Sequence, residues 1–162
     1  MTQIRTFEAP DWTQVEPIFR EVMAAGETYA GDPEMSDEEA RAYWLSDAHT
    51  VVAVDDDGTV LGSAHMGPNR PAQGSHVGTA SFMVASDARG RGLGRALGDY
   101  VVGWHRDHGF RGIQFNAVVE SNTAAVRLWL DLGFGIVGTV PGAFRLPSGE
   151  YVGLHVMYLP LG

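Results

Sequence analysis

Residues 84–97 have the sequence VASDARGRGLGRAL, in which three glycines and three arginines fall within seven positions. An apolar run, residues 80–85, leads into this turn, and a long helical pattern follows it without a break. A glycine-rich turn between a strand and a helix is typical of an anion site, because the first N–H groups of a helix have no internal partner and the helix dipole favours negative charge there. Glycine also lets the main chain approach a ligand closely. We therefore predict that this turn binds a pyrophosphate.

Three interpretations of the turn compete. A dinucleotide-binding turn fits poorly, because the spacing of Gly90, Gly92 and Gly94 departs from G-x-G-x-x-G and the turn follows a fourth strand. In addition, no acidic residue closes the next strand about 20 residues further on. A purely structural turn leaves three arginines in an otherwise acidic protein without an explanation. The third interpretation is a site for the pyrophosphate of coenzyme A.

The composition indicates one globular domain. The chain has 162 residues, which is enough for a single domain with its own core. A net charge of −9 argues against a protein that binds nucleic acid. We expect no signal peptide and no membrane span, because the N-terminus lacks an apolar segment and no run of about 18 apolar residues occurs. The absence of cysteine excludes disulfides and fits a reducing compartment, so we expect a cytoplasmic protein.

The charge is unevenly distributed along the chain. Residues 1–57 contain fourteen acidic and three basic side chains, whereas residues 58–162 contain six acidic and eight basic ones. Two interpretations are open: the second part binds an anion and the first lies near a cation, or the first part simply has a solvated acidic surface.

The hydrophobic periodicity predicts strands and helices in alternation. The expected strands are residues 4–7, 49–54, 60–65, 76–84, 110–119, 136–140 and 151–159. The expected helices begin at Asp11, Ser36, Arg91 and Asn122, with a capping box formed by Ser36 and Glu39. This order predicts a single α/β domain with a mixed sheet. Residues 110–119 are apolar on both faces, which is typical of a central parallel strand.

Two motifs in the chain resemble those of a known family. Arg89-x-x-Gly92-x-Gly94 matches the Arg/Gln-x-x-Gly-x-Gly/Ala signature of the GCN5-related N-acetyltransferases (GNAT). Residues 122–134, an Asn-led helix that ends in Leu-Gly-Phe, resemble the second signature of that family. The resemblance covers the whole chain and implies a single N-acetyltransferase domain, residues 1–162, with the GNAT fold. In that fold about four helices surround a mixed sheet of about seven strands, which is splayed between the fourth and fifth strands.

The resemblance implies an acetyl-CoA site between the splayed strands. Main-chain N–H groups of residues 90–95 would hold the pyrophosphate, and a main-chain N–H at a bulge near Met83 would polarise the acetyl carbonyl. Asn122 would bond the pantetheine arm, although its position as a helix N-cap is already a sufficient structural reason. The implied cofactor-binding residues are Phe82, Met83, Val84, Arg89, Gly90, Arg91, Gly92, Leu93, Gly94, Arg95, Asn122, Ala125 and Trp129.

Proton transfer is the step that the sequence specifies least. The acceptor amine must lose a proton, and the departing thiolate must gain one. Many members of the family use a tyrosine for the second task, at the position that Trp129 occupies here, but an indole N–H is not a practical acid. We therefore expect Trp129 to pack against the cofactor or the core. Glu120, at the mouth of the splay, is either the group that receives the amine proton or a solvated loop acid, and it joins Met83 and Asn122 as a candidate catalytic residue.

A narrower resemblance concerns the acceptor. Residues 114–122, QFNAVVESN, are similar to the corresponding stretch of the yeast proline-analogue (azetidine-2-carboxylate) N-acetyltransferases. Asn116 matches an acceptor-binding asparagine of that subgroup, whereas Thr79 replaces a second one. An amide on a buried strand needs a partner, so Asn116 contacts either the substrate or a neighbouring loop. Tyr29 and His76 are the other candidate acceptor residues, and for His76 a hydrogen bond to a loop carbonyl is the alternative role.

These observations predict an enzyme that transfers an acetyl group from acetyl-CoA directly to the amine or imine nitrogen of a small molecule, such as an amino acid or a proline analogue. Two alternatives stay open: an enzyme that acetylates a protein or peptide, and a regulatory domain that binds coenzyme A without catalysis. The histidines have no ligand spacing, so we predict no metal site. The apolar last strand could pair across a homodimer.

Overall fold

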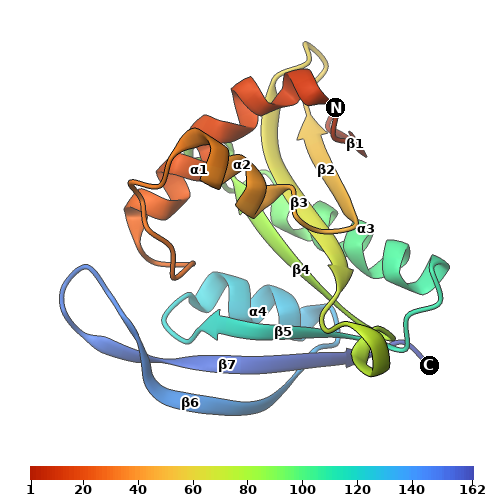
Figure 1. Ribbon diagram of the computed structural model, residues 1–162, viewed down its shortest axis with the longest axis vertical. Coiled ribbons are helices and arrows are strands. Elements are labelled where there is room, and N and C mark those ends of the chain that lie inside the picture. The colour runs from red at the N-terminus through yellow and green to blue at the C-terminus, as the bar shows by residue number, and fades with distance from the viewer.

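A mixed seven-stranded sheet runs through the molecule in the order β1-β2-β3-β4-β5-β7-β6 (Figure 1). The computed structural model describes all residues from Met1 to Gly162. The strands are β1 (Gln3–Thr6), β2 (His49–Val54), β3 (Val60–Pro68), β4 (Val77–Val84), β5 (Gly112–Val119), β6 (Gly135–Arg145) and β7 (Tyr151–Pro160). Neighbouring strands are antiparallel except for the parallel pair β4 and β5. The predicted α/β class and the mixed sheet of seven strands are confirmed.

Four α-helices cover the two faces of the sheet. On one face, α1 (Trp12–Ala25) and α2 (Asp37–Trp44) pack over β2 and β3, and on the other lie α3 (Leu93–Asp107) and α4 (Thr123–Asp131). Because successive side chains of a strand point to opposite faces, Val51 of β2 packs in the core beneath α3 and Val52 packs beneath α1. None of the four helices combines the length and the apolar character that crossing a membrane requires.

Local signals place α2 and α4 where the sequence predicts them, whereas the predicted N-cap of α1, Asp11, makes no capping hydrogen bond because its carboxylate pairs with Arg5. At the start of α2, the Ser36 hydroxyl accepts the N–H of Glu39 and the Glu39 carboxylate accepts the N–H of Ser36, which confirms the predicted capping box. At the start of α4, the Asn122 side chain accepts the N–H of Ala125 at 3.3 Å. Gly26 ends α1 in the left-handed region, with φ 63°.

Strands β4 and β5 separate almost as soon as they meet. Their parallel pairing comprises only two residue pairs, Val77 with Gly112 and Gly78 with Ile113. Beyond these pairs the strands diverge, as the sequence predicts, and Figure 1 shows the resulting gap in the sheet. Residues 110–119 are therefore not a regular central parallel strand. A register shift between Phe115 and Val118 leaves two residues of β5 exposed, because a bulge turns them out of the ladder.

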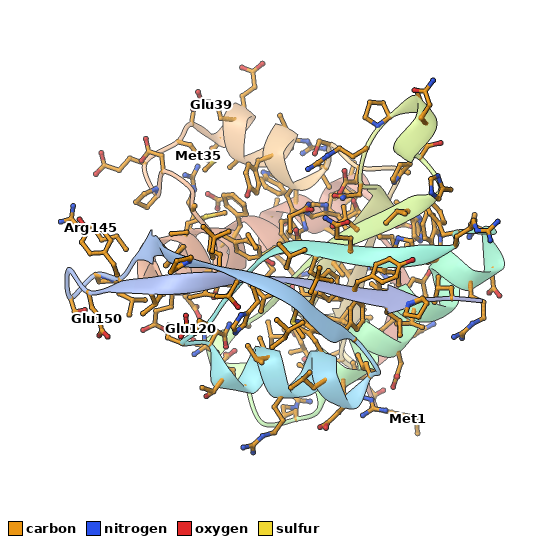
Figure 2. All side chains as sticks on the ribbon, turned by 90° about the horizontal axis from the view of Figure 1, so that it is seen from below. Met1, Met35, Glu39, Glu120, Arg145 and Glu150 are labelled. Atoms are coloured by element: carbon orange, nitrogen blue, oxygen red, sulfur yellow. The ribbon has the colours of Figure 1, made fainter.

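The last two strands form a long hairpin that extends past the body of the sheet, with Arg145 and Glu150 near its tip (Figure 2). β6 reaches Arg145, whereas the sequence predicts its end at residue 140. β7 lies between β5 and β6 and pairs with both. The expectation that the last strand pairs across a homodimer is therefore wrong, since neither edge of β7 is free.

Candidate functional site

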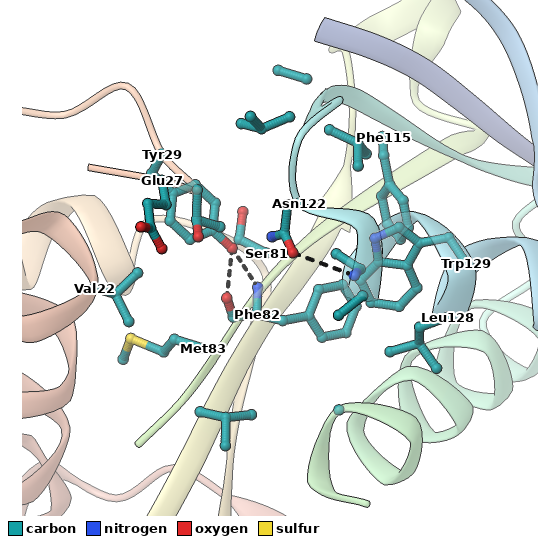
Figure 3. A pocket seen from close by; sticks show the side chains of 18 of the residues that line it. Val22, Glu27, Tyr29, Ser81, Phe82, Met83, Phe115, Asn122, Leu128 and Trp129 are labelled. Carbon is teal, nitrogen blue, oxygen red and sulfur yellow. Dashed lines mark hydrogen bonds between the residues drawn. The ribbon is translucent and has the colours of Figure 1, made fainter. Parts of the chain in front are cut away.

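A cleft of about 860 Å³ opens where β4 and β5 separate (Figure 3). One wall comes from β4 and the loop between α1 and α2, and the other comes from β5 and α4. The residues that line it include Tyr29, Thr79, Ser81, Phe82, Met83, Val84, Arg89, Gly94, Phe115, Asn116, Asn122, Ala125 and Trp129. Most of the predicted cofactor and acceptor residues therefore share one cavity.

The main chain of β4 presents alternate residues to the cleft. The Ala85 N–H donates to Leu61 of β3 at 2.8 Å, and a Cβ added at Gly62 would lie 2.8 Å from the Met83 carbonyl oxygen. The polar main-chain groups of Met83 thus face β3, and no register shift interrupts the pairing of β3 with β4. The prediction of a bulge that turns the Met83 N–H toward the cofactor is wrong. Because a strand alternates, the groups of Phe82 face the cleft instead.

The Tyr29 hydroxyl occupies both main-chain groups of Phe82. It donates to the Phe82 carbonyl oxygen at 2.6 Å and accepts the Phe82 N–H at 2.8 Å, as the dashed lines in Figure 3 show. Burial raises the pKa of Tyr29 to about 12, so the hydroxyl stays protonated at neutral pH and does not serve as a base. The Tyr29 hydroxyl therefore pairs with the two main-chain groups of Phe82 that β5 would pair with in an unbroken sheet.

The glycine-rich turn has the backbone geometry of an anion site. Gly90 and Gly92 have φ values of 79° and 76°, a region that favours glycine, and α3 begins immediately afterwards at Leu93. A Cβ at either glycine would meet nothing within 4 Å, so it is the backbone conformation that requires glycine there. The N–H groups of the first turn of α3 have no partner within the helix. They lie at the end of the cleft marked by Arg89 and Gly94.

The three arginines of the turn have different surroundings. Arg89 lines the cleft. Arg91 instead forms an ion pair of 3.1 Å with Asp55 in the β2–β3 turn, and this contact holds the pKa of the Asp55 carboxyl below its usual value. Arg95 pairs with Asp99 one helical turn later, at 3.2 Å. The sequence prediction treats the three as equivalent, but only Arg89 lines the cavity.

The wall formed by α4 and β5 is aromatic. Trp129 is buried and packs against Phe82, with ring centroids 4.7 Å apart, and against Phe115 at 4.9 Å. Its side chain lies between the cleft and the core, where the sequence predicts it (Figure 3). Asn122 caps α4 and also lines the cleft, so its two expected roles are compatible.

Only some of the residues predicted to bind the acceptor or take its proton lie in the cleft. Tyr29, Thr79 and Asn116 line the cleft, whereas His76 and Glu120 do not. His76 is exposed at the opposite end of β4, beside the paired part of β4 and β5. The Glu120 carboxylate accepts the N–H of Gly153 on β7 at 2.7 Å. Glu120 thus fastens the end of β5 to β7, and the roles predicted for both residues at the site are wrong.

Asn116 is exposed, contrary to the expectation of a buried amide, because it lies in the β5 bulge. Its amide exchanges two hydrogen bonds with the amide of Asn69, at 2.6 and 3.2 Å, and accepts a third from Gln114 at 3.0 Å. The alternative of a contact with a neighbouring loop is confirmed, since Asn69 lies in the loop after β3. Asn116 nevertheless also lines the cleft.

Two residues near the acceptor end are not among those that the sequence predicts. Ser81 lines the cleft beside Thr79, and the period-two spacing of these polar residues in an apolar strand was a usable signal. Asn69 lies in a Pro/Gly loop, and nothing in the sequence connects it to Asn116. No group of three or more His, Asp or Glu side chains in the structure is arranged to hold a metal ion.

Comparison with known proteins gives the family. The sequence model of the acetyltransferase (GNAT) family matches residues 12–134, which is more than half of the chain. This protein belongs to the GNAT family. A GCN5-related N-acetyltransferase from Kribbella flavida is 58% identical, with a TM-score of 0.95 over 98% of this chain and 97% of that one.

Two further relatives are an acetyltransferase of solved structure and a curated protein matched by sequence. A phosphinothricin acetyltransferase from Sinorhizobium meliloti, solved in complex with acetyl-CoA, is 26% identical, with a TM-score of 0.86 over 99% of this chain and 89% of that one. N-acetyltransferase aca1 from Schizosaccharomyces pombe is 32% identical over 99 residues, or 60% of this chain. The matched region spans about half, 47%, of the length of that curated relative.

Proposed function

We propose that this protein transfers the acetyl group of acetyl-CoA directly to the amine or imine nitrogen of a small molecule. The observation that carries the proposal is the continuity of one cleft, which runs from the glycine-rich turn and Arg89 past the Phe82 main chain to Thr79 and Asn116. An anion site at one end suits a pyrophosphate. The polar residues at the other end suit a polar acceptor. The acetyl-CoA complex of the Sinorhizobium meliloti relative supports the choice of cofactor.

The reacting carbonyl would lie at Phe82. The amine attacks the thioester carbon, and the electron pair of the breaking C–S bond leaves on sulfur as the thiolate of coenzyme A. The Phe82 N–H is one of the main-chain donors of β4 that face the cleft, and it lies between the glycine-rich turn and the acceptor end, so we assign to it the role first predicted for Met83. A fixed donor directed at a developing oxyanion contributes about 3–4 kcal/mol to transition-state stabilisation. Trp129 supplies packing, and water takes the amine proton and protonates the thiolate.

The acceptor end favours a small polar amine. Thr79, Ser81 and the amide of Asn116 offer hydrogen-bonding groups, and the lining residues of the cleft include no arginine besides Arg89. A neutral amide pair binds an amino or carboxyl group without an ion pair. We therefore keep the proline analogue azetidine-2-carboxylate, together with amino acids, as the first acceptors to test.

The test is a coupled assay that measures release of the coenzyme A thiol, with each product identified by its mass. The panel contains proline, azetidine-2-carboxylate, common amino acids, phosphinothricin and short peptides with a free N-terminus, with acetyl-CoA alone as the blank. We expect thiol release above the blank with at least one small amine and a product heavier by one acetyl group. Turnover with peptides alone would replace this proposal by peptide acetylation. Tight binding of acetyl-CoA without turnover on any amine would leave only a regulatory domain.

A further inference from the structure

Tyr29 and the acetyl group compete for one hydrogen atom. The Phe82 N–H donates to the Tyr29 hydroxyl at 2.8 Å, and its carbonyl accepts the same hydroxyl at 2.6 Å. One N–H cannot donate a well-aligned hydrogen bond to two oxygens at once, because both would have to lie along the N–H direction. If the thioester oxygen takes the Phe82 N–H, the Tyr29 oxygen must leave it.

We propose that Tyr29 is a displaceable cap, which covers the acetyl-binding donor of β4 in the free protein and is expelled when the thioester carbonyl arrives. This inference rests on the proposed function, since it takes the Phe82 N–H as the donor to the acetyl oxygen. It assigns Tyr29 a role different from acceptor binding. The hydroxyl pairs with the N–H and the carbonyl of Phe82, which β5 would pair with in an unbroken sheet. Without this contact the two groups would lack a partner in the free protein, which costs free energy.

The segment that carries Tyr29 is suited to move. It lies between α1 and α2, and no main-chain group of residues 27–31 takes part in a main-chain hydrogen bond. Tyr29 itself is partly exposed on the cleft side, although its ring packs against the core beneath α1. Figure 3 shows Tyr29 and Glu27 facing the cleft from this segment. The contact with Phe82 is thus the polar anchor of the segment on β4.

The cap makes a prediction that depends on the acetyl group alone. Acetyl-CoA must break the Tyr29 contact to reach the Phe82 N–H, so the free energy needed to displace Tyr29 weakens the observed binding of acetyl-CoA. Coenzyme A has no acetyl oxygen and leaves the contact intact. Removal of the hydroxyl should therefore strengthen the binding of acetyl-CoA and leave the binding of coenzyme A unchanged.

The experiment measures the Kd of acetyl-CoA and of coenzyme A by calorimetry for the wild type, Tyr29→Phe and the control Tyr100→Phe. Tyr100 lies on α3, away from the cleft, and its hydroxyl also forms a hydrogen bond, with the imidazole of His49 on β2 at 3.1 Å. For Tyr29→Phe we expect acetyl-CoA to bind about threefold to tenfold more tightly, the equivalent of one net hydrogen bond, and coenzyme A to bind as before. For Tyr100→Phe we expect no change in either. Weaker binding of acetyl-CoA by Tyr29→Phe, or an equal change for both ligands, overturns the proposal.

A second measurement uses the wild type, in case Tyr29→Phe folds poorly. With ζ-¹³C-labelled tyrosine, one of the five tyrosine resonances should shift on addition of acetyl-CoA and stay in place on addition of coenzyme A. No acetyl-specific shift would refute displacement. These binding results are separate from the thiol-release assay: turnover with an unresponsive Tyr29 refutes the cap alone, whereas an acetyl-specific response without turnover refutes the proposed function alone.

Discussion

At the scale of the residue, position along one strand or turn decides which groups can reach a ligand. Phe82 and Met83 are neighbours in sequence, yet their main-chain groups point to opposite sides of β4. The three arginines of the turn also differ in what they can reach. Arg91 already pairs with Asp55 and Arg95 with Asp99. A sequence motif identifies such residues as a group. Only the strand register and the neighbouring side chains show which of them can contact a ligand.

We expect Arg89→Ala to weaken the binding of acetyl-CoA about tenfold to hundredfold, because a charged hydrogen bond to phosphate is worth about 1.5–3 kcal/mol. Arg91→Ala is the matched control: its guanidinium pairs with Asp55, so its loss should change the Kd by less than about threefold. Calorimetry with acetyl-CoA measures both. An equal loss of affinity in the two variants would contradict the distinction between these arginines.

Asn116→Ala should raise the KM for the acceptor, identified in the thiol-release assay, about tenfold and leave the KM for acetyl-CoA nearly unchanged. Asn69→Ala should raise the same KM by a smaller factor, because Asn69 holds the Asn116 amide through two hydrogen bonds. His76→Ala serves as the control, since His76 lies outside the cleft. If neither asparagine variant alters the acceptor KM, Asn116 has only a structural role.

At the scale of the element, the start of α3 combines a turn that requires glycine at positive φ with N–H groups that have no partner in the helix. Gly92→Ala places a side chain at φ 76°, which costs about 1–2 kcal/mol, and we expect lower stability together with weaker binding of acetyl-CoA. Gly103→Ala, in the middle of α3 with no atom within 4 Å of the new Cβ, should instead stabilise the protein by about 0.5–1 kcal/mol. Denaturant unfolding measures both changes. Unchanged stability and affinity in Gly92→Ala would remove the role assigned to the turn.

The elements themselves could be predicted because their signals are local. Ser36 with Glu39, Asn122 and Gly26 mark helix ends through hydrogen bonds within a few residues. Register and strand order are not local. The orientation of Phe82 depends on the pairing of β4 with β3, and the position of β7 between β5 and β6 depends on the whole sheet. The wrong predictions for Met83, for Glu120 and for the pairing of β7 across a homodimer all depend on these long-range features.

At the scale of the whole molecule, a buried histidine couples stability to pH. His105 of α3 is fully buried, its Nδ1 lies 2.8 Å from the Val101 carbonyl oxygen, and its Nε2 has no partner. Burial lowers the pKa of His105 below its usual value of 6.5. The unfolded chain therefore binds a proton that the folded protein does not, and stability falls as the pH drops below about 6.5 toward the folded-state pKa.

The free energy of unfolding should thus decrease between pH 7 and pH 5 by up to about 1.4 kcal/mol per pH unit for this proton. Burial also lowers the pKa of His49, so part of the slope is expected to persist in His105→Gln. His76→Gln, at an exposed position, should keep the wild-type slope. Urea unfolding at several pH values measures the slopes. The coupling is refuted if His105→Gln and the wild type lose stability in parallel.

We propose that the gap between β4 and β5 is the acetyl-CoA cleft, with its anion end at the glycine-rich turn. A crystal structure of the protein with acetyl-CoA tests this directly. It should show the pyrophosphate against the N–H groups of residues 90–95 and the thioester oxygen on the Phe82 N–H, with the Tyr29 hydroxyl moved away. A pyrophosphate bound elsewhere, or a thioester oxygen that does not contact β4, would show that acetyl-CoA does not bind in this way.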